Sequence, residues 1–188
     1  MVTVKDTGFA GLKLLEPQVF RDNRGYFFES WKRSDFEAAG LPCEFVQDNE
    51  SLSCYGVIRG LHWQAAPFAQ TKLLRVVTGR ILDVVVDLRR AEPTYGKHFA
   101  VELDGESHRQ LYIPKGFAHG FAVLSPQAVV NYKVDAAWNR ESERCLLCTE
   151  ASLGIAWPVP EADRIYSEKD RQGMTWRQFE ASSREEVF

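Results

Sequence analysis

The sequence lacks several features that would place the protein in a special class. No apolar run approaches the roughly 20 residues that a membrane-spanning helix requires. The first residues, Met1–Gly11, lack the basic and apolar regions of a signal peptide, so a cytoplasmic location is expected. The net charge is −3, which excludes a general basic field for nucleic acid. We therefore expect neither a nucleic-acid partner nor a membrane partner.

Cysteine is scarce: only Cys43, Cys54, Cys145 and Cys148 are present. The last two form a CxxC, a spacing used in zinc and redox sites. No second CxxC completes a tetrahedral zinc site, and in a strand a spacing of three places the two thiols on opposite faces. The sequence therefore favours ordinary, buried thiols in this CxxC, and we expect no metal.

No internal repeat, low-complexity segment or linker interrupts the 188 residues, so one domain over residues 1–188 is expected. Many short segments are rich in β-branched and aromatic residues and are separated by Gly, Pro, Asp and Asn, a pattern that predicts strands. Their regular spacing indicates a mostly β sandwich or barrel. The predicted strands are Arg24–Trp31, Gly79–Leu88, Lys97–Leu103, Phe121–Leu124 and Ala128–Val134.

Helical signals are few and lie at the edges of the chain. Ser34–Glu37 has the pattern of a capping box, and Gly40 would end a short helix there. Residues 174–188 predict a short C-terminal helical extension with Trp176 and Phe179 on its apolar side. The helices are therefore expected to be short and peripheral.

The densest group of polar candidates lies between Gln47 and Lys72. If Arg59–Gln64 is extended, His62 and Gln64 share a face that would line the cavity of a barrel. For His62 the alternative is a hydrogen-bonded structural histidine. Lys72 precedes an apolar strand, so it either reaches solvent or is charged inside a cavity.

Four further residues have both a structural and a functional interpretation. Tyr132 falls on the apolar, inward parity of its strand, as a core tyrosine or as a phenol general acid. His119 shares its parity with two phenylalanines and is another cavity candidate. Asp83, if buried, needs a partner such as a histidine. Trp138 begins a loop, where it would stack on a base or close the barrel end.

The chain also carries a set of longer motifs between about Arg21 and Asp170. They are DNRGYFFES, FVQDNES, GVIRGLHWQ, QTKLLRV, ILDVVVDLR, PTYGKH, IPKGFAHGFAVLS, NYKV, GIAWP and YSEKD. In this order and spacing they resemble the dTDP-4-dehydrorhamnose 3,5-epimerase family. The resemblance implies a cupin-type jelly-roll barrel, usually a homodimer, without metal or cofactor. It also implies inversion of dTDP-4-dehydro-6-deoxy-D-glucose at C3 and C5, giving dTDP-4-dehydro-L-rhamnose.

The resemblance implies a role for individual residues. The catalytic base falls on His62, the proton donor on Tyr132, and the carboxylate that orients the base on Asp170, with Asp83 as a second candidate. Trp138 takes the position of the aromatic that stacks on thymine, where the family often has tyrosine. The nucleotide and sugar contacts fall on Arg24, Glu29, Gln47, Asp48, Asn49, Arg59, Lys72, His119, Glu143 and Lys169.

These residue types suit the implied chemistry. A C4 ketone makes the protons at C3 and C5 removable, and a neutral imidazole is a suitable base near neutral pH. Lys72 or a histidine donor would stabilise the enolate oxygen. Arg24 and Arg59 would hold the diphosphate. Arg24 and Glu29 are five residues apart, so a regular strand points them to opposite faces unless Gly25 forms a bulge; a strand shared in a dimer would also explain them.

Three other functions compete with this interpretation. A metal-dependent cupin would need clustered histidines, but Gln64 stands where such sites usually have a second histidine. A non-catalytic sugar-nucleotide-binding cupin would lack the acid–base pair that His62 and Tyr132 supply. A single-carbon epimerase, acting at C3 only or C5 only on a related 4-keto-6-deoxy sugar, would share nearly all the motifs.

Overall fold

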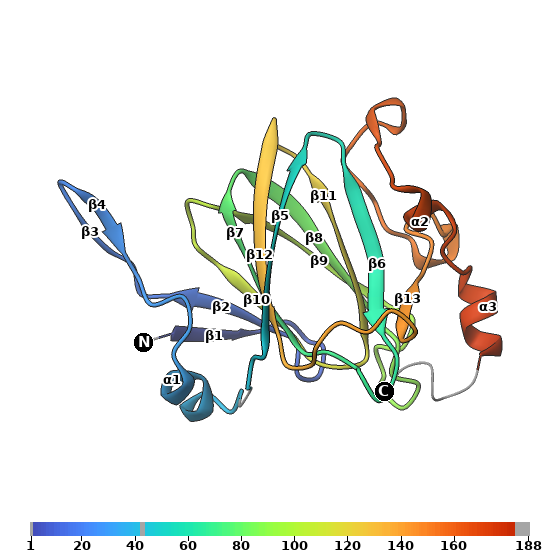
Figure 1. Ribbon diagram of the computed structural model, residues 1–188, viewed down its shortest axis with the longest axis horizontal. Coiled ribbons are helices and arrows are strands. Elements are labelled where there is room, and N and C mark those ends of the chain that lie inside the picture. The colour runs from blue at the N-terminus through green and yellow to red at the C-terminus, as the bar shows by residue number, and fades with distance from the viewer. Residues whose placement is uncertain (1, 42–43, 183–188) are drawn as a thin grey trace.

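The computed structural model describes residues 2–41 and 44–182, and two antiparallel sheets packed face to face form its centre (Figure 1). One sheet has the order β1-β2-β10-β7-β12-β5 and the other the order β13-β6-β11-β8-β9. The six strands of the first are Val2–Asp6, Lys13–Pro17, Gln110–Ile113, Lys72–Thr78, Gln127–Val134 and Gln47–Cys54, in the same order. Those of the second are Glu143–Cys145, Ile58–Gln64, Phe117–Val123, Arg80–Asp87 and His98–Asp104.

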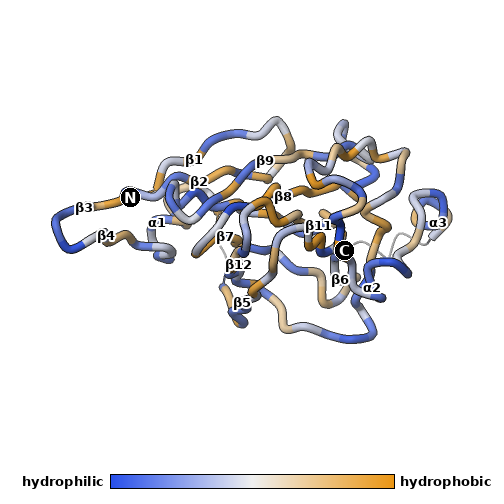
Figure 2. Tube along the Cα trace, turned by 90° about the horizontal axis from the view of Figure 1, so that it is seen from above, coloured by the Kyte–Doolittle hydropathy of each residue, from blue (hydrophilic) through white to orange (hydrophobic). Residues whose placement is uncertain are grey.

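This arrangement confirms the predicted mostly β, jelly-roll type of fold, although hydrogen bonds do not close the sheets into a continuous barrel. Four of the five predicted strands are present as β8, β9, β11 and β12. The apolar residues lie along the strands in the middle of the molecule, for example in β8, and the outer loops are more hydrophilic (Figure 2). The strand periodicity in the sequence therefore corresponds to real strands with one face in the core.

Three apolar clusters hold the layers together. One cluster, which includes Leu74, Val85 and Phe121, is buried between the two sheets. A second cluster, which includes Leu61, lies on the outer face of the five-stranded sheet under the C-terminal segment. A third, around Leu15, packs the six-stranded sheet against the first helix. Because β8 places Asp83 on the same parity as Val85, this carboxylate enters the inter-sheet layer.

The prediction of one strand over Arg24–Trp31 is wrong. The chain instead forms a separate two-stranded hairpin from β3 (Phe20–Asp22) and β4 (Gly25–Phe27), which projects from the body of the molecule (Figure 1). Gly25 has a φ of +132°, and the carboxylate of Asp22 accepts the N–H of Arg24, so a tight turn replaces the first residues of the expected strand. The pairing ends at Phe27, and Glu29 lies beyond it.

The first helix, α1 (Arg33–Ala38), has the predicted end but not the predicted beginning. The carbonyl of Lys32 accepts the N–H groups of Asp35 and Phe36, so the helix starts before Ser34 and the expected capping box does not form. Gly40 has a φ of +71°, and Leu41 donates to the carbonyl of Phe36, as in a Schellman motif. The glycine was therefore the more reliable of the two local signals.

The C-terminal segment covers the outer face of the five-stranded sheet. It contains two single-turn 3-10 helices, Ala151–Leu153 and Glu161–Asp163, followed by α2 (Glu168–Arg171) and α3 (Trp176–Ala181). Thr175 and Gln178 form a capping box on α3, and the fully buried ring of Phe179 packs edge-on against Trp63 at 5.7 Å. The predicted helical extension is present here, while its residues 183–188 lie outside the described part, as does Cys43. Nowhere in residues 2–41 and 44–182 is a helix long and apolar enough to cross a membrane.

Candidate active site

A cavity of about 170 Å³ opens between the two sheets. Its walls come from strands of both sheets and from the loop after β12. It is smaller than the ~300–1,000 Å³ typical of a complete small-molecule site. The lining residues are Ser51, Arg59, His62, Trp63, Gln64, Gln70, Lys72, His119, Gly120, Phe121, Tyr132, Trp138 and Glu143. A cavity of this size holds a single sugar ring more readily than a whole nucleotide sugar.

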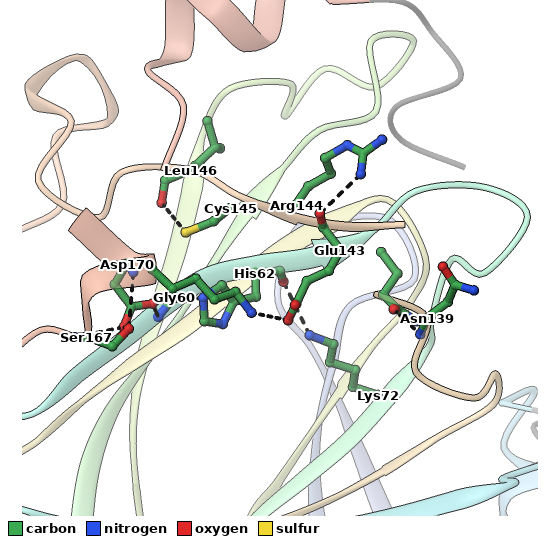
Figure 3. Close-up of polar contacts among 12 residues, drawn as sticks. Gly60, His62, Lys72, Asn139, Glu143, Arg144, Cys145, Leu146, Ser167 and Asp170 are labelled. Atoms are coloured by element: carbon green, nitrogen blue, oxygen red, sulfur yellow. Dashed lines mark hydrogen bonds and ion pairs between the residues drawn. The ribbon is translucent and has the colours of Figure 1, made fainter. Parts of the chain in front are cut away.

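His62 and Asp170 form a close pair at one wall of the cavity (Figure 3). Nε2 of His62, on β6, lies 2.8 Å from Oδ1 of Asp170, on α2. The oxygen stands off the direction of the ring N–H, so the two groups are in close contact without an aligned hydrogen bond. The pairing assigns Nε2 to the carboxylate and leaves Nδ1 as the nitrogen available for another partner.

Asp170 is itself held by several donors. Oδ1 accepts the N–H of Gly60 at 3.0 Å, and Oδ2 accepts the hydroxyl of Ser167 at 2.5 Å and its N–H at 3.2 Å. Burial alone would raise the pKa of Asp170, but the contacts with His62, Ser167 and Gly60 outweigh it and lower the pKa to about 2. The carboxylate is therefore ionised and fixed in orientation at neutral pH.

The opposite sheet contributes Lys72 and Tyr132 to the same cavity. Lys72, on β7, is buried, and its Nζ donates to the carbonyl of His62 at 3.3 Å (Figure 3). Burial lowers the pKa of Lys72 to about 8, although the charges of Asp83 and Glu143 oppose this. Tyr132, on β12, lies half-buried, and burial raises the pKa of its phenol. At neutral pH the lysine is mostly charged and the phenol is protonated.

A second histidine–carboxylate pair lies beside the first. His119 is opposite His62 in the register of β11 and β6, and its Nε2 lies 2.9 Å from Oδ2 of Asp83. Asp83 is fully buried, and its Oδ1 has no hydrogen-bond partner among the described residues. Each carboxylate therefore contacts a different histidine: Asp170 contacts His62, and Asp83 contacts His119.

Gly60 explains how the strands that carry both histidines approach each other. Its φ is +106°, and a Cβ atom at this position would lie 2.5 Å from the carbonyl oxygen of His119 and 2.7 Å from Cα of Gly120. The pairing of β6 and β11 shifts register between His119 and Phe121. Glycine is therefore required for this close backbone approach, and its N–H is one of the donors to Asp170.

The loop after β12 is tied to the cavity by glutamine side chains. Gln64 accepts the N–H of Asn139 at 2.7 Å and donates to the carbonyl of Ala137 at 3.2 Å. Gln47 accepts the N–H of Trp138 at 3.0 Å. The indole of Trp138 is 54% exposed and lines the cavity mouth, where one face is free to contact a ligand.

Glu143 and Lys169 form an ion pair at the edge of the cavity. Glu143 belongs to β13 and also lines a neighbouring open groove of about 700 Å³. Cys145, on the same strand, lies in this groove next to Gly173. Burial raises the pKa of the Cys145 thiol to about 12 and that of Cys148 to about 11, so both thiols are protonated at neutral pH.

Three of the residues predicted from the sequence lie elsewhere. Arg24 lies in the projecting hairpin and pairs with Asp22 at 2.6 Å, and Glu29 lies just after it, 4.0 Å from Lys32. The side chain of Asp48 contacts Lys133 on the exposed side of β5. Gln47 and Asn49 share the other side of that strand, where Nε2 of Gln47 donates to Oδ1 of Asn49.

Six cavity residues were not among the predicted catalytic and substrate-contact residues: Ser51, Trp63, Gln64, Gln70, Gly120 and Phe121. Ser51 has the same strand parity as Gln47 and Asn49, and this periodicity was the signal that would have identified it. Gln70 donates to the carbonyl of Ala136 at 2.7 Å, so it also fastens the Trp138 loop. Gln70 begins the QTKLLRV motif, but its bond to a loop distant in the sequence is not visible in any local pattern.

The chain is similar to known proteins over most of its length. The profile of the dTDP-4-dehydrorhamnose 3,5-epimerase family matches residues 6–178. The chain is 51% identical over 161 residues to dTDP-4-dehydrorhamnose 3,5-epimerase of Pseudomonas aeruginosa, covering 85% of this chain and 88% of that protein.

Solved structures are similar over nearly the whole chain. A 3,5-epimerase from Legionella pneumophila in complex with dTDP-4-keto-L-rhamnose has a TM-score of 0.92 and 39% identity, covering 100% of this chain and 97% of that one. A 3'-monoepimerase from Streptomyces bikiniensis in complex with dTDP-quinovose has a TM-score of 0.86 and 30% identity, covering 92% and 87%. From its sequence and its fold, the chain is an enzyme of the dTDP-4-dehydrorhamnose 3,5-epimerase family.

Proposed function

We propose that the enzyme inverts dTDP-4-dehydro-6-deoxy-D-glucose at C3 and C5, with His62 as the base and Tyr132 as the proton donor. The observation that carries this proposal is their placement on opposite walls of one cavity. His62 belongs to a strand of the five-stranded sheet and Tyr132 to a strand of the six-stranded sheet. A sugar ring between them would meet a base on one face and an acid on the other, as inversion requires.

The base acts through Nδ1 of His62. The ionised, anchored Asp170 beside Nε2 favours the tautomer with its proton on Nε2, so that Nδ1 is free to accept a proton from C3 or C5. When the imidazole becomes charged, the adjacent carboxylate stabilises it. General base catalysis of this kind contributes roughly 10²–10⁴-fold to a rate.

Loss of the proton leaves an enolate whose charge lies largely on the C4 oxygen. The ammonium of Lys72 lines the cavity and supplies the charge and the donor that this oxygen needs, and His119 would add a second donor only as the imidazolium, with both ring nitrogens protonated. Lys72 is buried, so its field is weakly screened by water. Asp83 fixes the ring of His119 through Nε2 and so orients its other nitrogen.

The second half of the reaction returns a proton from the opposite face. The phenol of Tyr132 remains protonated at neutral pH because burial raises its pKa. A proton from the hydroxyl goes to the enolate carbon and gives the inverted centre. Solvent then restores the phenol proton, and the imidazolium of His62 returns its proton to water before the second centre reacts.

The nucleotide lies outside the small cavity, toward Trp138 and Arg59. Trp138 offers an exposed aromatic face for the thymine, and the guanidinium of Arg59, whose Nε donates to Ser53 at 3.0 Å, offers donors for the diphosphate. Lys169, Glu143, Gln47 and Asn49 surround this side and complete the set of proposed substrate contacts. The ligand in the Legionella pneumophila structure, a dTDP-linked keto sugar, supports this class of substrate.

Arg24 and Glu29 serve the site of a second subunit in this proposal. The hairpin that carries Arg24 projects from the molecule (Figure 1). It exposes Phe20, Tyr26 and Phe27 at 55%, 53% and 66%. Three exposed aromatics on one small hairpin are unusual unless another surface covers them. We infer a homodimer in which each hairpin contributes its arginine and glutamate to the partner's nucleotide site.

Deuterium exchange tests the proposed reaction directly. The enzyme is incubated with dTDP-4-dehydro-6-deoxy-D-glucose in deuterated water, and the C3 and C5 proton signals are followed by NMR. Loss of both signals is expected. Loss of one alone would make the protein a single-carbon epimerase, the activity of its Streptomyces bikiniensis relative.

Two pairs of variants connect exchange to the proposed residues. His62→Ala should abolish exchange at both carbons, whereas His98→Ala, which removes a histidine bonded to the carbonyl of Leu153, should not. Tyr132→Phe should retain part of the exchange but lose inversion, with Tyr55→Phe as its control. Near-native turnover in His62→Ala would overturn the proposed mechanism, and a protein that binds the substrate without any exchange would be a sugar-nucleotide-binding cupin.

A further inference from the structure

Three side chains with metal-binding atoms, one of them the proposed base, lie close together. A ring nitrogen of His62, a carboxylate oxygen of Asp170 and the sulfur of Cys145 all lie within 4.8 Å of one another. Cys145 is directly opposite His62 in the register of β13 and β6, so the two side chains leave the same face of the sheet. The proposed reaction uses His62 and Asp170 but gives the thiol no role.

The spacing of these atoms is close to that of a zinc site. With bonds of about 2.0–2.3 Å, the ligand atoms of tetrahedral zinc are about 3.3–3.8 Å apart. The Nε2–Oδ1 distance of 2.8 Å is slightly shorter than this range. Shifts of about 1 Å in the side chains would therefore suffice to place all three atoms around one ion. The fourth position would remain for water.

The chemistry of these three ligand atoms also suits a zinc ion. Asp170 is a buried anion whose oxygens are oriented by Gly60 and Ser167, an arrangement that strengthens a metal ligand. Nε2 of His62 has no aligned hydrogen bond to lose. One nitrogen, one oxygen and one sulfur ligand together favour zinc over magnesium or calcium, which prefer oxygen.

We propose that Zn²⁺ binds between His62, Asp170 and Cys145 and thereby inhibits the enzyme. On binding, the thiol of Cys145 releases its proton to solvent and a sulfur–zinc bond forms. Zinc takes the lone pair of Nε2, so the ring proton of the neutral imidazole must reside on Nδ1. His62 then has no free nitrogen with which to accept a proton from the sugar.

The ion has a route to this position that does not cross the sugar cavity. Cys145 lines the open groove of about 700 Å³ next to the cavity, together with Glu143, Lys169 and Gly173. The Glu143 carboxylate offsets the lysine charge there, since the two form an ion pair. Cys148, the other half of the CxxC, instead packs in the apolar cluster under the C-terminal segment and is not part of the site.

Calorimetry tests the site without reference to activity. ZnCl₂ is titrated into the EDTA-treated and desalted protein in buffers with different ionisation enthalpies. We expect one zinc per chain with release of about one proton. Cys145→Ala and His62→Ala should each weaken binding at least about tenfold, because each removes a ligand. Cys54→Ala removes an exposed thiol and Cys148→Ala a buried one, and both should bind as the native protein does.

The inhibition rests on the proposed role of His62 and is measured separately, as deuterium exchange against free Zn²⁺. Native enzyme should lose exchange and regain it with EDTA, while Cys145→Ala should remain active at zinc concentrations at least about tenfold higher. Equal zinc sensitivity of Cys145→Ala and native enzyme would overturn the proposal, as would loss of binding in Cys148→Ala. If zinc binds as described but leaves exchange intact, the inhibition is refuted and the role of Nδ1 must be revised.

Discussion

Gln64 and Asn139 are joined by a hydrogen bond of 2.7 Å from the backbone N–H of Asn139 to the side-chain oxygen of Gln64. The amide nitrogen of the same glutamine donates to the carbonyls of Phe68 and Ala137. A residue that stands where metal-binding cupins usually have a second histidine thus secures the loop that carries Trp138. Gln64 therefore positions Trp138 for the proposed contact with thymine and has no direct part in the proposed proton transfers.

Gln64→Met should weaken substrate binding more than it slows the chemical step. The similar but apolar side chain removes all three hydrogen bonds and frees the Trp138 loop, so we expect KM to rise about tenfold with a smaller change in kcat. The unpaired groups should cost about 1–3 kcal/mol of stability. Steady-state kinetics and thermal unfolding measure the two effects. Gln18→Met, at an exposed position, is the control, and an unchanged KM in Gln64→Met would refute the role.

Asp170→Asn should lower kcat by roughly 10²–10⁴-fold, since the base loses the anion that fixes its tautomer and stabilises its charged form. Because the cavity residues are intact, KM should change little. Single-turnover exchange at C3 and C5 measures the loss. Asp163→Asn, an exposed carboxylate in the same C-terminal segment, should be unaffected. A variant that keeps native kcat would transfer the orienting role away from Asp170.

The same carboxylate should leave a signature in acid unfolding. The pKa of Asp170 is lower in the folded protein than in the unfolded chain, so its ionised form stabilises the fold. That contribution is present above about pH 4 and is lost as the pH falls toward about 2. Asp170→Asn should therefore show a shallower loss of stability over this interval than the native protein, measured by urea unfolding at each pH. Parallel curves would contradict the assignment.

Lys72 should set the alkaline limit of activity. Burial lowers its pKa to about 8, so the ammonium proposed to stabilise the enolate loses its proton as the pH rises through about 8. We expect kcat to fall above this pH, well before Tyr132 titrates, because burial raises the pKa of the phenol. A pH profile of kcat between about pH 6 and pH 10 measures this. A flat profile over that range would exclude a charged Lys72 as the stabilising group.

Lys72→Met should separate the lysine's role in catalysis from its effect on folding. A lysine whose pKa is lower in the folded state destabilises the fold below that pKa, and the penalty disappears above the unfolded value. The apolar variant should therefore be inactive but more stable at pH 7, by on the order of 1–3 kcal/mol. Lys115→Met, at the surface, is the matched control. Equal or lower stability of Lys72→Met would show that the buried charge is fully compensated.

Subunit mixing should reveal the proposed sharing of the hairpin. If Arg24 serves the partner's site, a heterodimer of Arg24→Ala and His62→Ala subunits has one site free of both changes. Equal amounts of the two inactive variants, unfolded together and refolded, should then regain about a quarter of native activity. If Arg24 served its own subunit, every site would carry one substitution and no activity would return. A monomer in sedimentation would remove the proposal altogether.

The local patterns in the sequence were sufficient for most of the strands and for the faces that their side chains occupy. The faces on which the side chains of His62, His119 and Tyr132 lie follow from parity alone, since alternation along a strand is a property of the backbone. Gly40 was also readable, because few other residues adopt a positive φ at a helix end. These predictions depend on neighbours in the chain, and such neighbours are visible in a sequence.

Contacts between distant segments were out of reach of those patterns. Nothing near His62 or His119 indicates that Asp170 pairs with the former and Asp83 with the latter, because the choice depends on how α2 and β8 pack. The hairpin was read as one strand because its aromatic residues have the composition of a core strand. Composition does not distinguish a side chain buried in its own subunit from one exposed for a partner.

The geometry of the site is sensitive to any substitution of Gly60. Any side chain there would enter the space of the backbone of His119 and Gly120, so the damage would reach both histidines through the main chain and not through a lost contact. In a library of all single substitutions, this position should tolerate none, although glycine supplies no functional group to the reaction. Attempts to redesign the enzyme for other sugars must therefore vary the cavity walls and leave Gly60 unchanged.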